Sequence, residues 1–201
     1  MSVTGWPARC EGMGSPRSSS YADAVALYLV RHGRPVVDPS VPASTWVLDP
    51  EYEHLVTEMA ARAPWSAGAV WFTSPEPKAA RTARLLAGRD VPLVDDLREH
   101  VRRGTGLLSD FVDSVGEAFA HPYSETHPGW EPIAQTRSRV VAAVRRILED
   151  HPGRDVVLVG HGTAWTLLAA FLTGTEPDLE RWRALTMPDV ITVEGPAFQG
   201  H

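Results

Sequence analysis

Two near-continuous apolar runs stand out along the chain, at residues 25–30 and 156–159. Apolar runs that do not alternate with polar residues are typical of strands buried on both faces, as in a parallel sheet. Shorter apolar runs at residues 69–72, 91–94 and 190–193 predict three further strands. The chain therefore alternates candidate buried strands with longer segments of mixed character.

Helical spacing of apolar residues predicts helices in the segments between these strands. Asp49-Pro50 marks a helix start, with a capping side chain and a proline in the first turn, and the helix is expected to run to about Arg62. Further helices are predicted at about residues 75–86, 107–119, 131–150 and 163–172. Strands that alternate with helices indicate an α/β fold, here a three-layer α/β/α sandwich with a mostly parallel central sheet.

The chain length of 201 residues suits one domain with a loose tail. Residues 1–22 are rich in Gly, Pro and Ser, and we interpret them as a flexible N-terminal tail. The domain is expected to span residues 23–201. Within it, residues 100–130 carry the weakest pattern and are expected to form a lid over a pocket.

The amino-acid composition limits which partners the protein is expected to bind and in which compartment it is expected to lie. The formal net charge of −6 gives no basic footprint for nucleic acid or for an anionic membrane. No run approaches the ~18 apolar residues of a membrane span, and residues 1–20 have no apolar signal segment. Cys10 is the only cysteine, which fits a reducing compartment. These features predict a cytoplasmic protein that binds neither nucleic acid nor membranes.

The candidate chemistry lies where the two long apolar strands end. The first strand ends in Arg31-His32-Gly33 and the second in Gly160-His161-Gly162. Ligands of open α/β sheets bind at the carboxyl ends of the strands, so both histidines face one pocket if the strands are neighbours. Two imidazoles and one guanidinium close together predict a pocket that binds an anion and contains a nucleophile.

These histidines have two other interpretations. A single histidine near a strand end is more often a hydrogen-bonded structural residue, but two His-Gly pairs at the most apolar strands favour a functional role. A zinc site needs three or four suitable ligands. The chain has no HExxH motif and no cysteine pair, so we predict neither a metal nor a cofactor.

The motif at residues 29–33, Leu-Val-Arg-His-Gly, resembles the signature of the histidine phosphatase superfamily, which includes the cofactor-dependent phosphoglycerate mutases. The resemblance continues through residues 74–83, 97–99 and 159–162, in the order of the family, and spans about residues 25–195. It implies a phosphoglycerate mutase-like sandwich and a two-step transfer of a phosphoryl group.

The resemblance also implies residue roles. His32 is the nucleophile that carries a phosphohistidine, while Arg31, His161 and Gly162 bind the phosphoryl group. Glu99 matches the general acid, which protonates the leaving oxygen and then activates water. That role needs a raised pKa, which burial or a nearby phosphate would supply. Asp95 and Asp96 are the alternative acids.

The sequence departs from the family pattern at two places. Lys78 stands where the family carries a phosphate-binding arginine, and lysine cannot grip two oxygens in a fixed fork. Arg81 lies three residues on, on roughly the same helix face, and either supplies the missing fork or is solvated. Arg34 replaces the usual residue after His32-Gly33, where it either adds charge at the pocket mouth or lies exposed in a loop.

These features favour a phosphatase that hydrolyses a small-molecule phosphomonoester. One alternative is a phosphomutase of phosphoglycerate type. The other is a catalytically weakened protein that binds a phospho-ligand, and Lys78 favours this alternative. The resemblance allows a homodimer. The aromatic and arginine side chains of the lid either suit an organic phosphate or pack the lid onto the domain; they are Arg102, Arg103, Phe111, His121, Tyr123, His127 and Trp130.

Overall fold

Four strands form one central sheet in the computed structural model, which describes residues 26–104 and 109–195. The strands lie in the order β2-β3-β1-β4, with the first three parallel and β4 antiparallel to β1. Their bounds are Ala26–Arg31 for β1, Val70–Thr73 for β2, Val156–Gly160 for β3 and Asp189–Glu194 for β4. The predicted mostly parallel sheet is confirmed.

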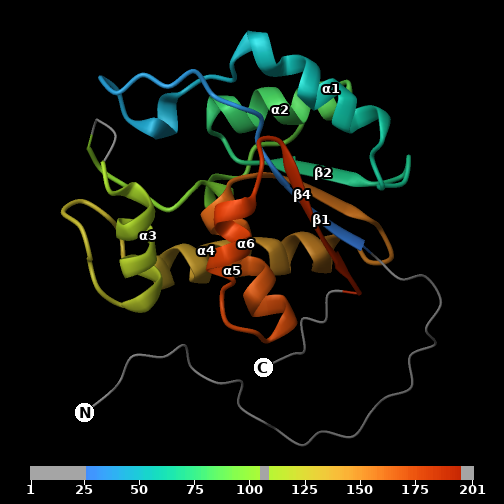
Figure 1. The fold of residues 1–201 in the computed structure, drawn as a ribbon. Helices are drawn as coiled ribbons and strands as arrows, with labels where there is room; N and C mark the ends of the chain where they lie inside the picture. The colour runs from blue at the N-terminus through green and yellow to red at the C-terminus, as the bar shows by residue number, and fades with distance from the viewer. Residues whose placement is uncertain (1–25, 105–108, 196–201) are drawn as a thin grey trace, which may run out of the picture.

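Helices cover both faces of this sheet, so the structure has three layers (Figure 1). Figure 1 shows α1 and α2 over one face, and α4, α5 and α6 over the other, with α3 beyond one end of α4. The helices span Glu53–Ala61 (α1), Pro77–Ala87 (α2), Phe111–Ala120 (α3), Ile133–Asp150 (α4), Gly162–Thr173 (α5) and Leu179–Ala184 (α6). Three short 3-10 helices are η1 (Ala43–Thr45), η2 (Pro50–Tyr52) and η3 (Asp95–Leu97).

The first strand shows why its sequence is continuously apolar. Leu27 and Leu29 pack into the core beneath α4 and α5, whereas Tyr28 and Val30 pack into the core beneath α1 and α2. Successive side chains of a strand point to opposite faces, so a strand covered on both sides must be apolar at every position. The two cores therefore follow from the same run of residues.

The structure differs from the predicted elements in three ways. The expected strand at residues 91–94 makes a single bridge, Thr73 to Leu93, because Pro92 has no N–H group to extend a ladder. The short helix α6 was not predicted. The helix expected at 107–119 is observed from Phe111, and residues 107 and 108 lie outside the described residues.

Two further predictions concern the N-terminal tail and the absence of a membrane span. The proposed tail at residues 1–22 lies outside the described residues, so its boundary with the domain stays a prediction. Across residues 26–104 and 109–195, no helix has the length and apolar character needed to cross a membrane.

Gly160, at the end of β3, lies against Trp165 of α5, and a substitution there tests how closely the sheet packs on this helix. Trp165 is fully buried, and its indole Nε1 donates a hydrogen bond of 2.8 Å to the Val30 carbonyl. A Cβ atom at position 160 would lie 2.6 Å from Cζ2 of this ring. Gly160→Ala should lower the free energy of unfolding by about 1–3 kcal/mol, because the packed indole cannot move aside.

Urea unfolding measures this change. The matched control is Gly68→Ala, where an added Cβ meets nothing within 4 Å. Equal unfolding free energies for the two variants would show that the contact at Gly160 is not restrictive.

Candidate active site

The ends of β1 and β3 bring His32 and His161 side by side. The two strands are adjacent and parallel, with Arg31 opposite Gly160, and the His32 N–H donates to the Gly160 carbonyl at 2.9 Å. The imidazole centroids are 5.2 Å apart with an edge-to-face geometry. His32 is 7% exposed and His161 is fully buried. The predicted convergence of the two histidines at one sheet edge is confirmed.

The tautomer of His32 follows from its hydrogen bond. Nδ1 lies 2.7 Å from the Gly33 carbonyl, and a carbonyl only accepts, so Nδ1 carries the proton. Nε2 then holds the lone pair. Burial lowers the pKa of His32 well below its usual value, and electrostatic interactions with His161, Lys78 and Arg31 lower it further. The ring is therefore neutral at physiological pH and can act as a nucleophile.

Thr82 of α2 fixes the backbone that follows His32. Its hydroxyl accepts a hydrogen bond from the Gly33 N–H at 3.0 Å and donates to the Lys78 carbonyl at 2.7 Å. A Cβ at position 33 would lie 2.7 Å from Leu48 and 2.8 Å from Val56. Only glycine allows this close approach, so the β1 loop and α2 keep a fixed relation around His32.

His161 is held in the neutral form. Its Nε2 lies 2.8 Å from the Ser74 hydroxyl and 3.4 Å from Oε1 of Glu76. Burial lowers its pKa to about 3; the charge of Glu99 opposes this shift, and the charges of Lys78, Arg102 and Arg139 add to it. Within the described part of the chain, Nδ1 of His161 is a buried nitrogen with no hydrogen-bond partner.

Arg31 lies between the sheet edge and the segment before β4. Its Nη1 donates to the Leu185 carbonyl at 2.5 Å, and its Nε comes within 3.3 Å of the place where a Cβ on Gly162 would lie. Among the described residues, Nε is also buried without a hydrogen-bond partner. Buried polar atoms that lack a partner are rare in folded proteins. Two of them, on Arg31 and His161, mark this region as a site for a polar ligand.

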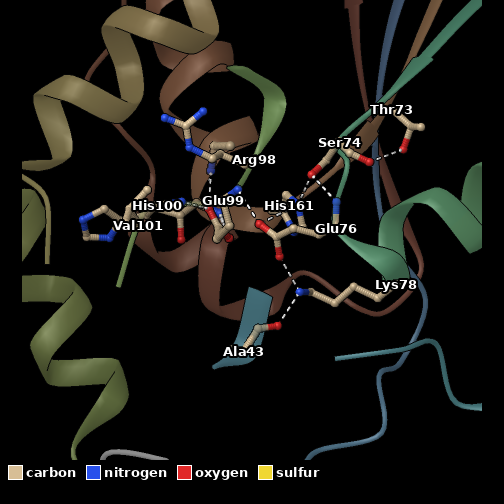
Figure 2. A network of polar contacts seen from close by, with 12 residues as sticks. Ala43, Thr73, Ser74, Glu76, Lys78, Arg98, Glu99, His100, Val101 and His161 are labelled. Atoms are coloured by element: carbon tan, nitrogen blue, oxygen red, sulfur yellow. Dashed lines mark hydrogen bonds and ion pairs between the residues drawn. The ribbon is translucent and has the colours of Figure 1, made fainter. Parts of the chain in front are cut away.

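A buried ion pair that the sequence analysis missed occupies the centre of the site. Figure 2 shows the Glu76 carboxylate between Lys78, His161 and the backbone of Glu99. Lys78 Nζ lies 2.5 Å from Oε2 of Glu76 and donates to the Ala43 carbonyl at 2.7 Å. Oε1 of Glu76 accepts from the Glu99 N–H at 2.9 Å. Glu76 therefore neutralises the cation at the position of the family's phosphate-binding arginine.

The only sequence signal for Glu76 was a carboxylate placed between two motif residues. It lies two residues after Ser74 and two before Lys78, flanked by prolines. Pro77 begins α2 immediately after it, with Glu76 as the residue that precedes the first helical turn. That position turns the Glu76 side chain back toward the sheet edge, as Figure 2 shows.

Glu99 caps the N-terminus of α5. Its carboxylate accepts from the backbone N–H groups of His100 at 2.9 Å, Ala164 at 3.1 Å and Thr163 at 3.2 Å. Burial raises its pKa, but electrostatic interactions with His161 and Arg102 and the hydrogen bond from the His100 N–H outweigh burial and lower the pKa to about 2. Burial alone therefore does not supply the raised pKa that the proposed acid needs, because the neighbouring cation and N–H groups stabilise the anion; a raised pKa from a nearby phosphate stays a prediction.

Arg139 of α4 holds the loop that carries Glu99. Its guanidinium donates to the carbonyls of Asp96 at 3.0 Å, Arg98 at 2.7 Å and Glu99 at 2.7 Å. It also pairs with Glu131 at 2.8 Å. This clamp fixes the backbone position of Glu99.

The alternative acids lie outside the site. Asp95 is exposed, and Asp96 pairs with Arg146 on the outer surface of α4 at 3.2 Å. The structure therefore does not bring either aspartate to the histidines.

Two arginines named from the sequence also lie elsewhere. Arg81 makes a two-point ion pair with Glu53 of α1, at 2.7 and 2.9 Å, so it does not supply a second fork beside Lys78. Arg34 is exposed and stacks on the Tyr52 ring at 4.4 Å. Both side chains found partners on the α1 side of the molecule.

Arg102 links the lid to the site. Its Nη2 donates to the Thr163 hydroxyl at 3.2 Å, and its guanidinium lies 4.8 Å from each of the Phe111 and Trp130 ring centroids. Trp130 belongs to a core that includes Phe119 of α3. These two rings therefore pack the lid onto the domain and hold a cation at the N-terminus of α5.

Comparison with known structures first defines the fold. The mycobacterial glucosyl-3-phosphoglycerate phosphatase is 20% identical over 85% of this chain and 90% of its own, with a TM-score of 0.67. YhfR of Bacillus stearothermophilus is 24% identical over 88% and 95% of the chains, with a TM-score of 0.68. A phosphoglycerate mutase from Bacillus anthracis is 19% identical over 86% and 88%, with a TM-score of 0.67. The fold is phosphoglycerate mutase-like.

The family model of the histidine phosphatase superfamily (branch 1) matches residues 27–195, so the chain belongs to this superfamily. A search of curated proteins finds no match. Across the described residues, no group of three or more His, Cys, Asp or Glu side chains is arranged to hold a metal ion.

The buried histidine of the site should make the protein labile to acid. The unfolded imidazole has a pKa near 6.5 and takes up a proton below that pH, while folded His161, with a pKa of about 3, does not. Stability should therefore fall as pH drops from 7 toward 3. Between pH 7 and 5, His161 alone should remove on the order of 2 kcal/mol from the free energy of unfolding.

Urea unfolding at pH 7 and pH 5 tests this expectation. His161→Gln should show a smaller loss than the wild type, whatever its stability at pH 7. His54→Gln, which replaces an exposed histidine of α1, should keep the full loss. An equal loss in wild type and His161→Gln would contradict the assignment.

Proposed function

We propose that the protein is a phosphatase that hydrolyses a small-molecule phosphomonoester through a phosphohistidine on His32. The observation that carries the proposal is the 2.7 Å hydrogen bond from Nδ1 of His32 to the Gly33 carbonyl. It places the lone pair on Nε2 of a buried, neutral ring. The superfamily match over residues 27–195 supports the same reaction class.

In the first step, Nε2 of His32 attacks phosphorus and the bond between phosphorus and the ester oxygen breaks. The alcohol leaves with a proton from a carboxyl group. In the second step, water attacks phosphorus, its proton passes to that carboxylate, and the phosphorus–nitrogen bond breaks to regenerate neutral His32. Arg31 and Lys78 supply positive charge, and His161 and Gly162 supply polar groups, for the equatorial oxygens.

Two buried polar atoms support an anion as ligand. Arg31 Nε and His161 Nδ1 lack partners among the described residues and lie on the two side chains that flank the strand ends. An anion that accepts a hydrogen bond from Arg31 Nε removes the cost of leaving that donor unpaired. The 7% exposure of His32 favours a substrate whose phosphoryl group enters alone, which suits a terminal monoester.

His32→Ala should lower the turnover of an aryl phosphate by at least about a thousand-fold, because no other side chain replaces the attacking nitrogen. Quenching the wild type during turnover should trap a phosphoryl group that is stable to alkali and labile to acid. His54→Asn, on the outer surface of α1, is the control and should retain full activity. Phosphate release that survives in His32→Ala would exclude the proposed mechanism.

A second candidate function is binding of a phospho-ligand without efficient turnover. The ion pair between Glu76 and Lys78, with both side chains under 10% exposed, favours it because the pair cancels the charge that would grip a phosphate. A panel of metabolite phosphates separates the possibilities. Release of inorganic phosphate supports the phosphatase, exchange between phosphoglycerates supports a mutase, and tight binding with neither reaction supports the binding protein.

A further inference from the structure

We propose that Ser74 sets the tautomer of His161, so that Nδ1 of that ring carries the proton and donates a hydrogen bond to the transferring phosphoryl group. This inference rests on the proposed function and assigns a positioning residue within the same site. Ser74 directly follows β2, and its fully buried hydroxyl lies 2.8 Å from Nε2 of His161. Ser74 therefore acts on the substrate through the imidazole.

The partners of the Ser74 hydroxyl determine where its proton points. Its oxygen accepts a hydrogen bond from the backbone N–H of Glu76 at 3.3 Å, as Figure 2 shows. Among the described residues, Nε2 of His161 is the other hydrogen-bond partner of this oxygen. A hydroxyl has one proton to donate, and the Glu76 N–H cannot accept it. The Ser74 proton therefore points to Nε2 of His161, which holds the lone pair.

The opposite tautomer leaves more buried polar groups unpaired. If Nε2 of His161 carried the proton, it would donate to the Ser74 oxygen, and the hydroxyl proton of Ser74 would have no acceptor among the described residues. Nδ1 of His161 is buried and has no hydrogen-bond partner within the same part of the chain. An N–H group at Nδ1 gains a partner when an anion binds, whereas a lone pair there would repel the anion.

The strand order indicates where Nδ1 of His161 points. The hydrogen-bonding directions of the two imidazole nitrogens diverge widely across the ring. Nε2 is directed at Ser74, which follows β2, and His161 itself follows β3. The sheet order β2-β3-β1 places His32 on the other side of His161, with the two ring centroids 5.2 Å apart. Nδ1 of His161 is therefore directed toward the side of the site where His32 attacks phosphorus.

The neighbouring carboxylate gives Ser74 a competitor. Burial lowers the pKa of His161 to about 3, so the ring carries one proton at neutral pH, on Nδ1 or on Nε2. Oε1 of Glu76 lies 3.4 Å from Nε2 and favours a proton there, because a carboxylate oxygen only accepts. The Ser74 hydroxyl is the closer partner of Nε2, at 2.8 Å, and donates to it. Ser74 thus keeps the ring proton on Nδ1.

The two histidines then share one tautomer but present different nitrogens to the substrate. The Gly33 carbonyl holds a proton on Nδ1 of His32, which leaves the lone pair of Nε2 for attack. Ser74 supplies a proton to Nε2 of His161, which leaves the Nδ1–H group as a donor to an equatorial phosphoryl oxygen. One ring bonds to phosphorus, and the other stabilises the negative charge on its oxygens.

Nitrogen-15 NMR of the histidine rings tests the assignment in the wild type, because protonated and lone-pair nitrogens resonate in separate ranges. At pH 7, His161 should carry its proton on Nδ1, and saturating inorganic phosphate should shift the Nδ1 proton signal while Nε2 stays unprotonated. His161→Asn identifies the signals of this ring by their loss. A proton on Nε2, with or without phosphate, would overturn the proposal, as would an Nδ1 proton signal that phosphate does not move.

Ser74→Ala should move the ring proton of His161 to Nε2, because Oε1 of Glu76 is then the acceptor that faces this nitrogen. The kcat/KM for an aryl phosphate should fall by at least about ten-fold, since the donor at Nδ1 is lost. The matched control Thr73→Val removes the neighbouring buried hydroxyl, which donates to the Val159 carbonyl at 3.1 Å. It should keep the wild-type tautomer and activity. An unchanged tautomer in Ser74→Ala would contradict the role of Ser74.

A double-mutant cycle separates the tautomer from a general loss of packing. His161→Asn places a side-chain amide N–H near the position of Nδ1 and has no tautomer to set. Ser74→Ala should therefore lower kcat/KM by at least about ten-fold in the wild type but by less than about two-fold in the His161→Asn background. Equal losses in the two backgrounds would show that Ser74 acts only on packing and would overturn the proposal.

The outcomes for this inference and for the proposed function are distinguishable, because the ring spectra do not depend on turnover. Phosphate release that persists in His32→Ala overturns the proposed function itself. Turnover that depends on His32, together with a proton on Nε2 of His161 in the wild type, overturns the role of Ser74 alone. The wild-type spectrum decides the tautomer even if Ser74→Ala does not fold.

Discussion

The site depends on the parallel pairing of β1 with β3. Parallel strands end at the same edge of a sheet, so one ladder aligns residues that are more than a hundred positions apart in the sequence. Here it places Arg31 opposite Gly160 and allows the His32 backbone to bond the Gly160 carbonyl. Each strand is apolar on both faces, and this burial stabilises the pairing that holds the histidines 5.2 Å apart.

Burial then governs the electrostatics of the site. Imidazoles lose the hydration that favours their charged form, so both histidines stay neutral where an exposed histidine would be partly charged. The carboxylate of Glu99 stays ionised in the same environment because it has Arg102 and backbone N–H groups as neighbours, which hold its pKa at about 2. The neutral histidines and the ionised Glu99 thus differ in their neighbours and not in their burial.

The fold could be predicted from the sequence because it depends on local features of the chain, namely the apolar runs that form buried strands. Apolar runs predicted β1 and β3, and histidines after both runs predicted a shared pocket, since strand ends meet in a parallel sheet. The roles of the side chains were harder to read. Arg81 has the helical spacing to reach the site beside Lys78, yet Glu53 from another helix binds it. The spacing of two residues along a helix predicts that their side chains lie on the same face. It does not show which residue of another helix will bind them.

The same reason explains Glu76 and Glu99. The Glu99 carboxylate accepts hydrogen bonds from N–H groups 64 and 65 residues further along the chain, which no local pattern contains. Glu76 carries no motif at all, and its place in the site follows from the turn before α2. The charge balance at a buried site is a property of the assembled neighbours, so the sequence showed Glu99 as a candidate but not its charge state, and it did not show Glu76 at all.

The Arg139 clamp has a consequence for how this chain can change. One side chain on α4 holds three carbonyls of the loop before the lid, those of Asp96, Arg98 and Glu99. Insertions or deletions in that loop would break these three bonds and leave the guanidinium to Glu131, whereas changes between Arg102 and Trp130 leave the clamp intact. The loop that carries Glu99 is thereby coupled to α4 as one mechanical unit, whereas the lid is free of this coupling.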